Sequence, residues 1–158
     1  MSNLISILLG IIFTVSSSFL FAHSAIALDS NLGLQDGYLS PCPESPNCVV
    51  SQNGDEEHSI KPITYTSDRD AARDTLLKIL TVTPRTEVIQ ADDNYILAES
   101  KSRIFGFVDD VEFYFPTEEK IIHLRSASRV GQSDLGVNRR RLEQIRLAMK
   151  DLGIAVRK

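Results

Sequence analysis

The chain has 158 residues, of which 42% are hydrophobic and 24% charged, and its formal net charge is −4. This length suits one globular domain, and the composition is ordinary for a soluble protein. The acidic balance argues against a nucleic-acid-binding protein, because such proteins usually carry a basic excess.

The N-terminal segment is uncharged, and its apolar part runs from Leu4 to Ala22. Ala25 and Ala27 follow in the A-x-A pattern that signal peptidase reads. We therefore predict a signal peptide over residues 1–27 and an exported mature chain that begins at Leu28. The alternative is an uncleaved anchor helix over residues 4–22, since about 20 apolar residues can span a bilayer. Only that segment would then contact the membrane.

Residues 28–58 form an irregular lead-in that is rich in Gly, Pro, Asn and Ser. The lead-in holds both cysteines, Cys42 and Cys48, in the segment C-P-E-S-P-N-C. Export favours a disulfide between them, because oxidising compartments preserve disulfides. A metal site is the alternative, but no Cys or His pair follows at a spacing suited to zinc. The spacing also differs from that of a C-x-x-C redox motif. We expect a structural disulfide, with no metal and no cofactor.

Residues 59–158 carry the periodic segments of an α+β domain. Strands are expected at 60–65, 86–90, 95–101, 108–115 and 120–126. One helix begins after Ser67 or Asp68 and ends at Thr83-Pro84, and the other runs from about Asn138 to Leu152. Their apolar positions at helical spacing are Ala72, Leu76, Ile79 and Leu80 in the first helix, and Leu142, Ile145, Met149 and Leu152 in the second.

Short connections between the strands predict a mainly antiparallel sheet of about five strands, in the order β-α-β-β-β-β-α. Both amphipathic helices should cover one face of this sheet, while the other face is open or covered only by the lead-in. The last hairpin has one apolar and one charged face. With a turn at 116–119, its register would place Glu112 opposite His123 and Asp110 opposite Arg125.

The stretch from Arg125 to Arg141 concentrates polar side chains between the last strand and the last helix. It holds five of the chain's 17 Lys and Arg residues. Its glycines would let the backbone approach a ligand, and a helix N-terminus presents free N–H groups to an anion. We therefore predict a site for a small anion such as phosphate, sulfate or a carboxylate. The candidate ligand-binding residues are Arg125, Ser128, Arg129, Ser133, Asp134, Asn138 and Arg141.

A structural interpretation of the same stretch stays open. Asp134 or Asn138 would then cap the helix, Arg125 would pair with Asp110, and Arg141 would pair with Asp134. In that case the polar groups would serve the fold rather than a ligand.

A small hydrolase-like or other enzyme is the alternative function. His123 beside Glu112 would be a general base oriented by a carboxylate, close to the Arg125–Arg141 stretch. Ser126 should point to the opposite face, however, and the sequence contains no G-x-S-x-G elbow. It also contains no phosphate-binding loop, dinucleotide fingerprint or metal cluster. We expect a non-enzymatic accessory or binding module whose ligand is a partner protein or a small anion.

Two stretches of the chain resemble one protein family. They are S-P-N-C-V together with the preceding Cys42, and R-S-A-S-R-V-G-Q-S-D-L-G-V-N-R-R-R-L-E. The family is the uncharacterised one catalogued as domain of unknown function 1499, and the resemblance covers roughly Gly37 to Lys150. Its members occur in bacteria, including cyanobacteria, and in photosynthetic eukaryotes. The resemblance implies no activity and no catalytic residues, but an exported cyanobacterial-type member would lie in the periplasm or the thylakoid lumen.

Overall fold

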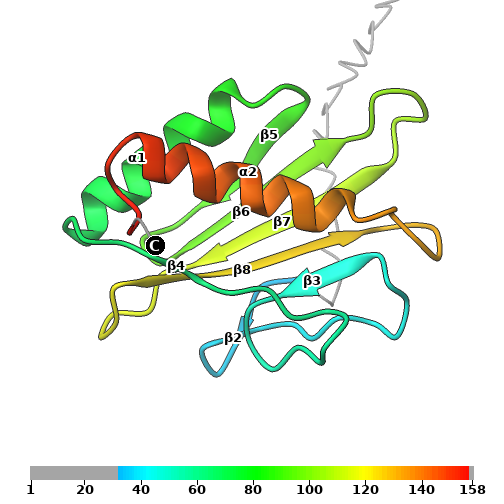
Figure 1. The fold of residues 1–158 in the computed structure, drawn as a ribbon, viewed down its shortest axis with the longest axis horizontal. Coiled ribbons are helices and arrows are strands. Elements are labelled where there is room, and N and C mark those ends of the chain that lie inside the picture. The colour runs from blue at the N-terminus through cyan, green and yellow to red at the C-terminus, as the bar shows by residue number, and fades with distance from the viewer. Residues whose placement is uncertain (1–31, 157–158) are drawn as a thin grey trace, which may run out of the picture.

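The structure, a computed structural model, describes residues 32–156 of the chain (Figure 1). The predicted signal peptide or anchor lies outside these residues. None of the helices within residues 32–156 combines the length and the apolar character that a bilayer-spanning helix needs.

Ten elements form the fold: β1 (Leu34–Gln35), β2 (Tyr38–Leu39), β3 (Cys48–Val50), β4 (Ile63–Thr64), α1 (Arg69–Val82), β5 (Thr86–Ala91), β6 (Tyr95–Lys101), β7 (Val108–Tyr114), β8 (Ile121–Ser128) and α2 (Val137–Asp151). The main sheet follows the antiparallel path β3-β8-β7-β6-β5, and β4 pairs with the beginning of β8. The predicted α+β class is confirmed, although the sheet has six strands instead of about five.

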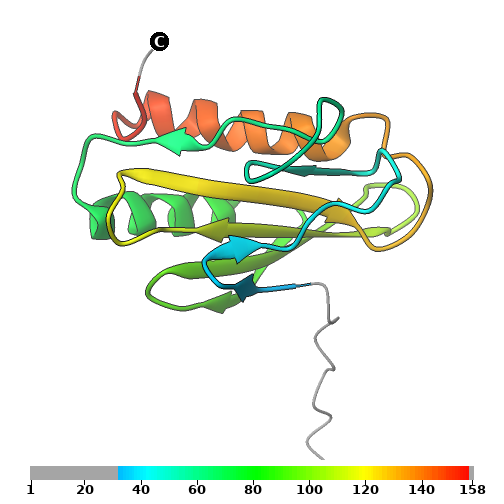
Figure 2. The ribbon, with the colours of Figure 1, turned by 90° about the horizontal axis from the view of Figure 1, so that it is seen from below.

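The two faces of the sheet are covered by different parts of the chain. Figure 2 shows α2 on one side and the β1–β2 hairpin on the other. The core between the sheet and the helices includes Ile96, Phe113 and Leu124. A smaller apolar cluster beneath the lead-in includes Leu39 and Tyr95. We call these two sides the helix face and the lead-in face.

The lead-in is less irregular than the sequence predicted, because β1, β2 and β3 all lie within it. The first two strands have only two residues each, joined by a turn at Asp36-Gly37 whose φ angles are positive. All three residues of β3 are buried, so the sequence has none of the alternation that marks a half-exposed strand. The lead-in therefore contributes one strand to the main sheet.

Helix α1 begins and ends where local sequence signals place it. The Asp68 side chain accepts a hydrogen bond of 2.8 Å from the N–H of Ala71, which satisfies one of the free donors of the first turn. The helix is capped at its other end by Thr83. The four apolar positions predicted for its inner face are all buried: Ala72, Leu76, Ile79 and Leu80.

Helix α2 buries three of the four apolar residues predicted for its inner face, namely Leu142, Ile145 and Met149. The prediction was wrong for Leu152, which is 60% exposed. Leu152 is the C-cap, and Gly153 after it has a φ of 75°, so the chain turns away from the helix there. Ile154 then packs against the core, and Ala155 is the next buried residue.

Strands β7 and β8 pair two residues away from the predicted register. The observed pairs include Tyr114–His123, Phe113–Leu124, Glu112–Arg125 and Asp110–Ala127. A shift of two residues keeps every side chain on its predicted face but changes its partner. The predicted pairs of Glu112 with His123 and of Asp110 with Arg125 are therefore wrong.

The register follows from contacts outside the hairpin. The N–H of Phe115 donates to the carbonyl of Asn94, and the carbonyl of Lys120 accepts from the N–H of Tyr65. Phe115 and Lys120 therefore pair with other segments instead of with each other. The connection between the two strands is consequently longer than the predicted four-residue turn.

Candidate functional site

The sheet separates the predicted ligand-binding residues into two clusters. Ser128, Asn138 and Arg141 meet on the helix face, whereas Arg125 and Arg129 bind carboxylates on the lead-in face. Successive residues of a strand point to opposite faces, so Arg125 and Ser128 are placed on different sides. The seven residues therefore belong to two clusters, although Ser128 at the end of β8 also lines a pocket with Arg125 and Arg129.

Asn138 is the centre of the helix-face cluster and is completely buried. Its Oδ1 accepts hydrogen bonds of 2.6 Å from Ser126 Oγ and from Arg141 Nη1. Its Nδ2 donates to the carbonyl of Asn47 at 2.9 Å and to Ser128 Oγ at 3.2 Å. Two acceptor and two donor positions are all that a side-chain amide offers, so Asn138 has none left for a ligand.

Asp109 completes the helix-face cluster. Its Oδ1 accepts from Ser128 Oγ at 2.6 Å, and its Oδ2 accepts from Arg141 Nη2 at 2.6 Å. Arg141 thus pairs with Asp109 and not with Asp134. The cluster joins β7, β8 and α2, which supports the structural interpretation for Ser128, Asn138 and Arg141.

The N-terminus of α2 is capped by the chain itself. Asp134 accepts hydrogen bonds from the N–H groups of Gly136 at 2.8 Å and Asn138 at 2.7 Å. A carboxylate therefore already occupies the position predicted for an anion. Ser133 is exposed, and its Oγ accepts a hydrogen bond of 3.3 Å from the N–H of Leu135.

The lead-in-face cluster is built around Glu112, which is completely buried. Its Oε2 accepts from Arg125 Nη1 at 2.7 Å. Its Oε1 accepts from the Tyr95 hydroxyl and from the N–H of Gly33, both at 2.8 Å. Burial, followed by the charge of Glu112, raises the pKa of Tyr95 far above its ordinary value. The tyrosine is therefore a stable donor to this carboxylate.

Arg129 holds two carboxylates beside this group. Its Nη2 and Nε donate to Asp110 at 2.8 and 3.0 Å, and Nη2 also donates to Glu99. The hydrogen bonds to Asp110 are the largest cause that raises the pKa of Arg129 above its ordinary value.

Arg125 and Arg129 line a pocket of about 430 Å³ between the disulfide loop and the β8–α2 loop. The predicted disulfide between Cys42 and Cys48 is present, with an S–S distance of 2.05 Å, and Cys42 is part of the pocket wall. The other apolar and polar residues of the wall are Leu32, Pro41, Pro43, Ser45, Asn47, Asp110, Ala127, Ser128, Val130 and Gly131.

Arg125, one of the residues of this pocket wall, has an unsatisfied hydrogen-bond donor. The residue is only 4% exposed, and its Nε has no hydrogen-bond partner within residues 32–156. A buried donor without a partner costs about 1–3 kcal/mol.

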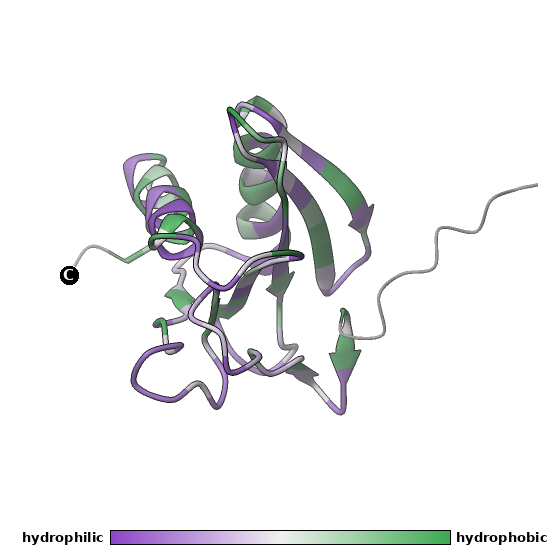
Figure 3. Cartoon of the chain, turned by 90° about the vertical axis from the view of Figure 1, so that its right-hand side faces the viewer, coloured by the Kyte–Doolittle hydropathy of each residue, from purple (hydrophilic) through white to green (hydrophobic). Residues whose placement is uncertain are grey.

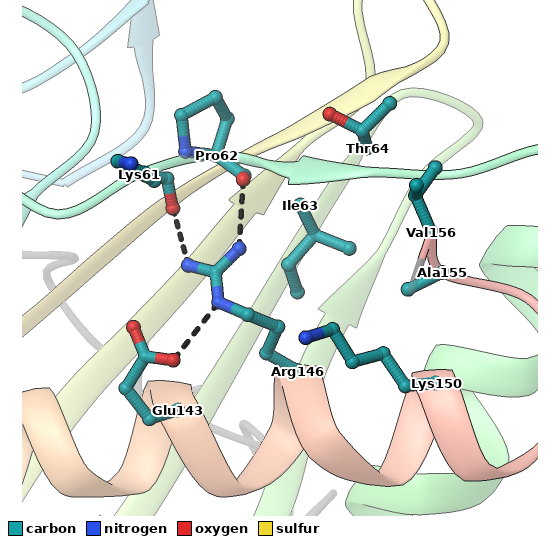
Figure 4. Close-up of a pocket in the computed structure, with 9 residues that line it drawn as sticks. All are labelled: Lys61, Pro62, Ile63, Thr64, Glu143, Arg146, Lys150, Ala155 and Val156. Carbon is teal, nitrogen blue, oxygen red and sulfur yellow. Dashed lines mark hydrogen bonds and ion pairs between the residues drawn. The ribbon is translucent and has the colours of Figure 1, made fainter. Parts of the chain in front are cut away.

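A second pocket, of about 390 Å³, lies between α2 and β4 (Figure 4). Arg146 projects from the helix and donates to the carbonyls of Pro62, at 2.7 Å, and Lys61. Its Nε donates to Glu143 at 3.0 Å. The guanidinium thus satisfies carbonyls at the edge of the sheet, which otherwise invite pairing with another chain.

His123, the predicted general base, has other partners than the predicted Glu112. His123 Nδ1 lies 3.1 Å from Ser51 Oγ, and its ring stacks on Tyr114. Ser51 Oγ also accepts from the N–H of Leu124 at 2.8 Å, so the serine continues the pairing of β3 with β8. Burial lowers the pKa of His123. Ser51 was not predicted, because it precedes His123 by 72 residues and carries no recognisable motif.

Within the described part of the chain, no group of three or more His, Cys, Asp or Glu side chains lies close enough together to hold a metal ion. Asp55 and His58 form a pair at 2.8 Å, and Asp92 and Asp93 stand at the β5–β6 turn.

The comparisons with known proteins give one match. The family model described as "Protein of unknown function (DUF1499)" matches residues 38–149. No curated protein and no solved structure matches the chain. The matched range includes both polar clusters and nearly the whole wall of the pocket at Arg125.

Proposed function

The chain belongs to the DUF1499 family, and we propose that this member is an exported, non-enzymatic binding module. Its ligand is a small molecule that carries a carboxylate or carbonyl group and binds in the pocket at Arg125. The Cys42–Cys48 disulfide supports export, because disulfides persist in oxidising compartments such as the periplasm or the thylakoid lumen.

The free Nε of Arg125 carries this proposal. Arg125 is held in place by Glu112, which keeps its guanidinium beside the pocket. An oxygen acceptor of the ligand would take the hydrogen bond that the described residues leave unmade. Hydrogen bonds to charged groups contribute about 1.5–3 kcal/mol.

The charges beside the pocket narrow the class of ligand. Two guanidiniums, those of Arg125 and Arg129, are surrounded by the three carboxylates of Glu99, Asp110 and Glu112. Two positive charges against three negative ones leave −1, which disfavours a multiply charged phosphate or sulfate. The same net charge repels a single carboxylate less strongly and does not repel a neutral carbonyl. The apolar part of such a ligand would lie against wall residues such as Pro41, Pro43 and Val130.

The lining of the pocket supports binding rather than covalent catalysis. Cys42 is oxidised, so it is no nucleophile. Ser45 Oγ donates to Asn47 and Ser128 Oγ donates to Asp109, while the pocket wall contains no histidine. A serine nucleophile normally needs an adjacent base that is free to take its proton.

The proposal is tested with a thermal-shift and calorimetry screen of acetate, benzoate, small amides, phosphate and sulfate. At a hundred times the dissociation constant, binding adds about 2.7 kcal/mol. A protein of this size shows that as a shift of several degrees. We expect monocarboxylates or amides to raise the melting temperature and phosphate and sulfate to leave it unchanged.

Three variants locate the binding site. Arg125→Lys keeps the charge next to Glu112 but lacks Nε, and it should abolish the shift. Val130→Glu places a negative charge on the exposed rim and should weaken carboxylate binding without disturbing the fold. Arg103→Ala, an exposed arginine outside the pocket, is the control and should bind like the parent. An equal shift in all variants, or no shift with any compound, rejects the proposal.

A further inference from the structure

Large apolar side chains are exposed at one end of the sheet. Ile104, Phe105 and Phe107, in the turn between β6 and β7, are 81%, 75% and 51% exposed, and Leu135 in the β8–α2 loop is 84% exposed. The two loops share this end because the N–H of Arg129 donates to the carbonyl of Val108 at 3.0 Å. Figure 3 looks onto this end of the molecule. We call the four residues the apolar tip.

The β6–β7 turn has a defined conformation. The N–H of Ser102 donates to the carbonyl of Phe107 at 2.8 Å, and the N–H of Phe107 donates back to Ser102 Oγ at 2.9 Å. The rings of Phe105 and Phe107 stack with their centroids 5.4 Å apart. These contacts hold the aromatic side chains beyond the end of the sheet, where no described residue buries them.

The charge around the apolar tip is opposite to that of the whole chain. Lys101 and Arg103 are exposed, and residues 101–108 contain no Asp or Glu, although the net charge of the protein is −4. Neither cation forms an ion pair with a residue of the described range. The acid of the neighbouring loop, Asp134, accepts backbone hydrogen bonds at the start of α2.

We propose that the apolar tip inserts into the interface of an anionic lipid bilayer, with Lys101 and Arg103 at the headgroups. Aromatic and aliphatic side chains next to basic residues are the combination that favours this environment. The aliphatic stems of Lys and Arg can lie along the apolar layer while their charges stay in water. This contact is separate from the N-terminal segment and independent of the ligand proposed at Arg125.

The shape and the charge of the tip favour a bilayer over a protein partner. The side chains project from two turns, and they line neither the pocket at Arg125 nor the pocket between α2 and β4. A protein partner would need a groove that fits the projecting turn, whereas a bilayer accepts it without one. Each basic residue near an anionic surface contributes about 1 kcal/mol.

The absence of tryptophan from the sequence provides a specific reporter. Phe105→Trp places the protein's one tryptophan on the exposed tip. Leu152→Trp is the matched control, because Leu152 is also exposed but lies at the C-terminal end of α2, opposite to the end that follows Leu135. The full chain is mixed with vesicles of equal parts phosphatidylcholine and phosphatidylglycerol. Both variants carry the same N-terminal segment, so its effect on vesicle binding is the same in each.

We expect the fluorescence of Phe105→Trp to shift to shorter wavelength on adding vesicles and to be quenched by lipids brominated on their acyl chains. Leu152→Trp should show neither change. Adding Arg103→Glu to Phe105→Trp should weaken the vesicle-dependent change by about fivefold or more. Unchanged fluorescence of Phe105→Trp overturns the proposal. A blue shift that depends on protein concentration without vesicles overturns it in favour of a second copy of the chain.

Discussion

Glu112 and Arg125 lie opposite each other on β7 and β8 and form an ion pair of 2.7 Å that is almost fully removed from water. The carboxylate accepts two further hydrogen bonds, from Tyr95 and Gly33, which compensate its burial. The pair belongs to the observed register of the two strands and holds Arg125 in the wall of the pocket. One contact thus connects the fold with the proposed site.

Removal of the negative charge should destabilise the protein strongly. Glu112→Gln keeps the size of the side chain but leaves Arg125 as an uncompensated buried charge, and we expect a loss of about 3–5 kcal/mol. Urea unfolding measures it. Glu143→Gln, which removes an exposed partner of Arg146, is the control and should change the stability by less than about 1 kcal/mol. Similar losses in both variants would contradict the role given to burial.

Replacing Asn138 should loosen the contact between α2 and the sheet. Asn138→Ala leaves the Ser126 hydroxyl, Arg141 Nη1 and the Asn47 carbonyl with fewer partners. Each buried polar group that is left unsatisfied costs about 1–3 kcal/mol, so urea unfolding should reveal a loss of several kcal/mol. Gln144→Ala, at an exposed position of the same helix, is the control. A small loss in Asn138→Ala would mean that water replaces the amide easily.

Reducing the disulfide should have a smaller effect. Cys42 and Cys48 enclose a short ring with a sequence separation of 6, so the chain-entropy model gives about 2–2.5 kcal/mol. Two prolines inside the ring already restrict the unfolded chain, and the measured loss should not exceed this value. Unfolding with and without a thiol reductant measures it. Reduction should also weaken ligand binding, because Cys42 lies in the pocket wall. A loss well above this value would point to further structure held by the bond.

Local signals predicted the helices well, while contacts between distant residues decided the rest. The cap at Asp68 and the apolar spacing of α1 depend only on neighbouring residues, and both were confirmed. The register of β7 and β8 depends instead on Asn94 and Tyr65, which belong to other segments. Glu112 was therefore assigned the wrong partner, although its face was correct.

The candidate site also depends on contacts that the sequence alone does not reveal. The seven residues are close in sequence, but the alternation of β8 places Arg125 and Ser128 on opposite faces. That alternation was visible in the sequence and could have divided the set before the structure was known. The apolar tip also had a signal, because Ile104, Phe105 and Phe107 surround a glycine between two expected strands. The unpaired Nε of Arg125 had no sequence signal, because its lack of a partner depends on all the contacts around that side chain.

The two histidines of the described part should give stability opposite dependences on pH. The hydrogen bond to Asp55 raises the pKa of His58 above its ordinary value of 6.5. Its stabilising contribution is therefore complete below pH 6.5 and is lost as the pH rises through the raised pKa. Burial lowers the pKa of His123 below 6.5. As the pH falls, the unfolded chain therefore binds this proton at a higher pH than the folded chain does. His123 therefore lowers stability as the pH falls below 6.5.

Variants that remove one histidine at a time should separate these effects. In His58→Gln, His123 is the remaining titrating histidine of the described part, and stability should rise as the pH approaches 6.5 from below. In His123→Gln the contribution of His58 remains, and stability should fall as the pH rises above 6.5. Urea unfolding at several pH values measures both slopes, and His23 and the carboxylates are common to the two variants. Slopes of the same sign would mean that another group dominates the titration.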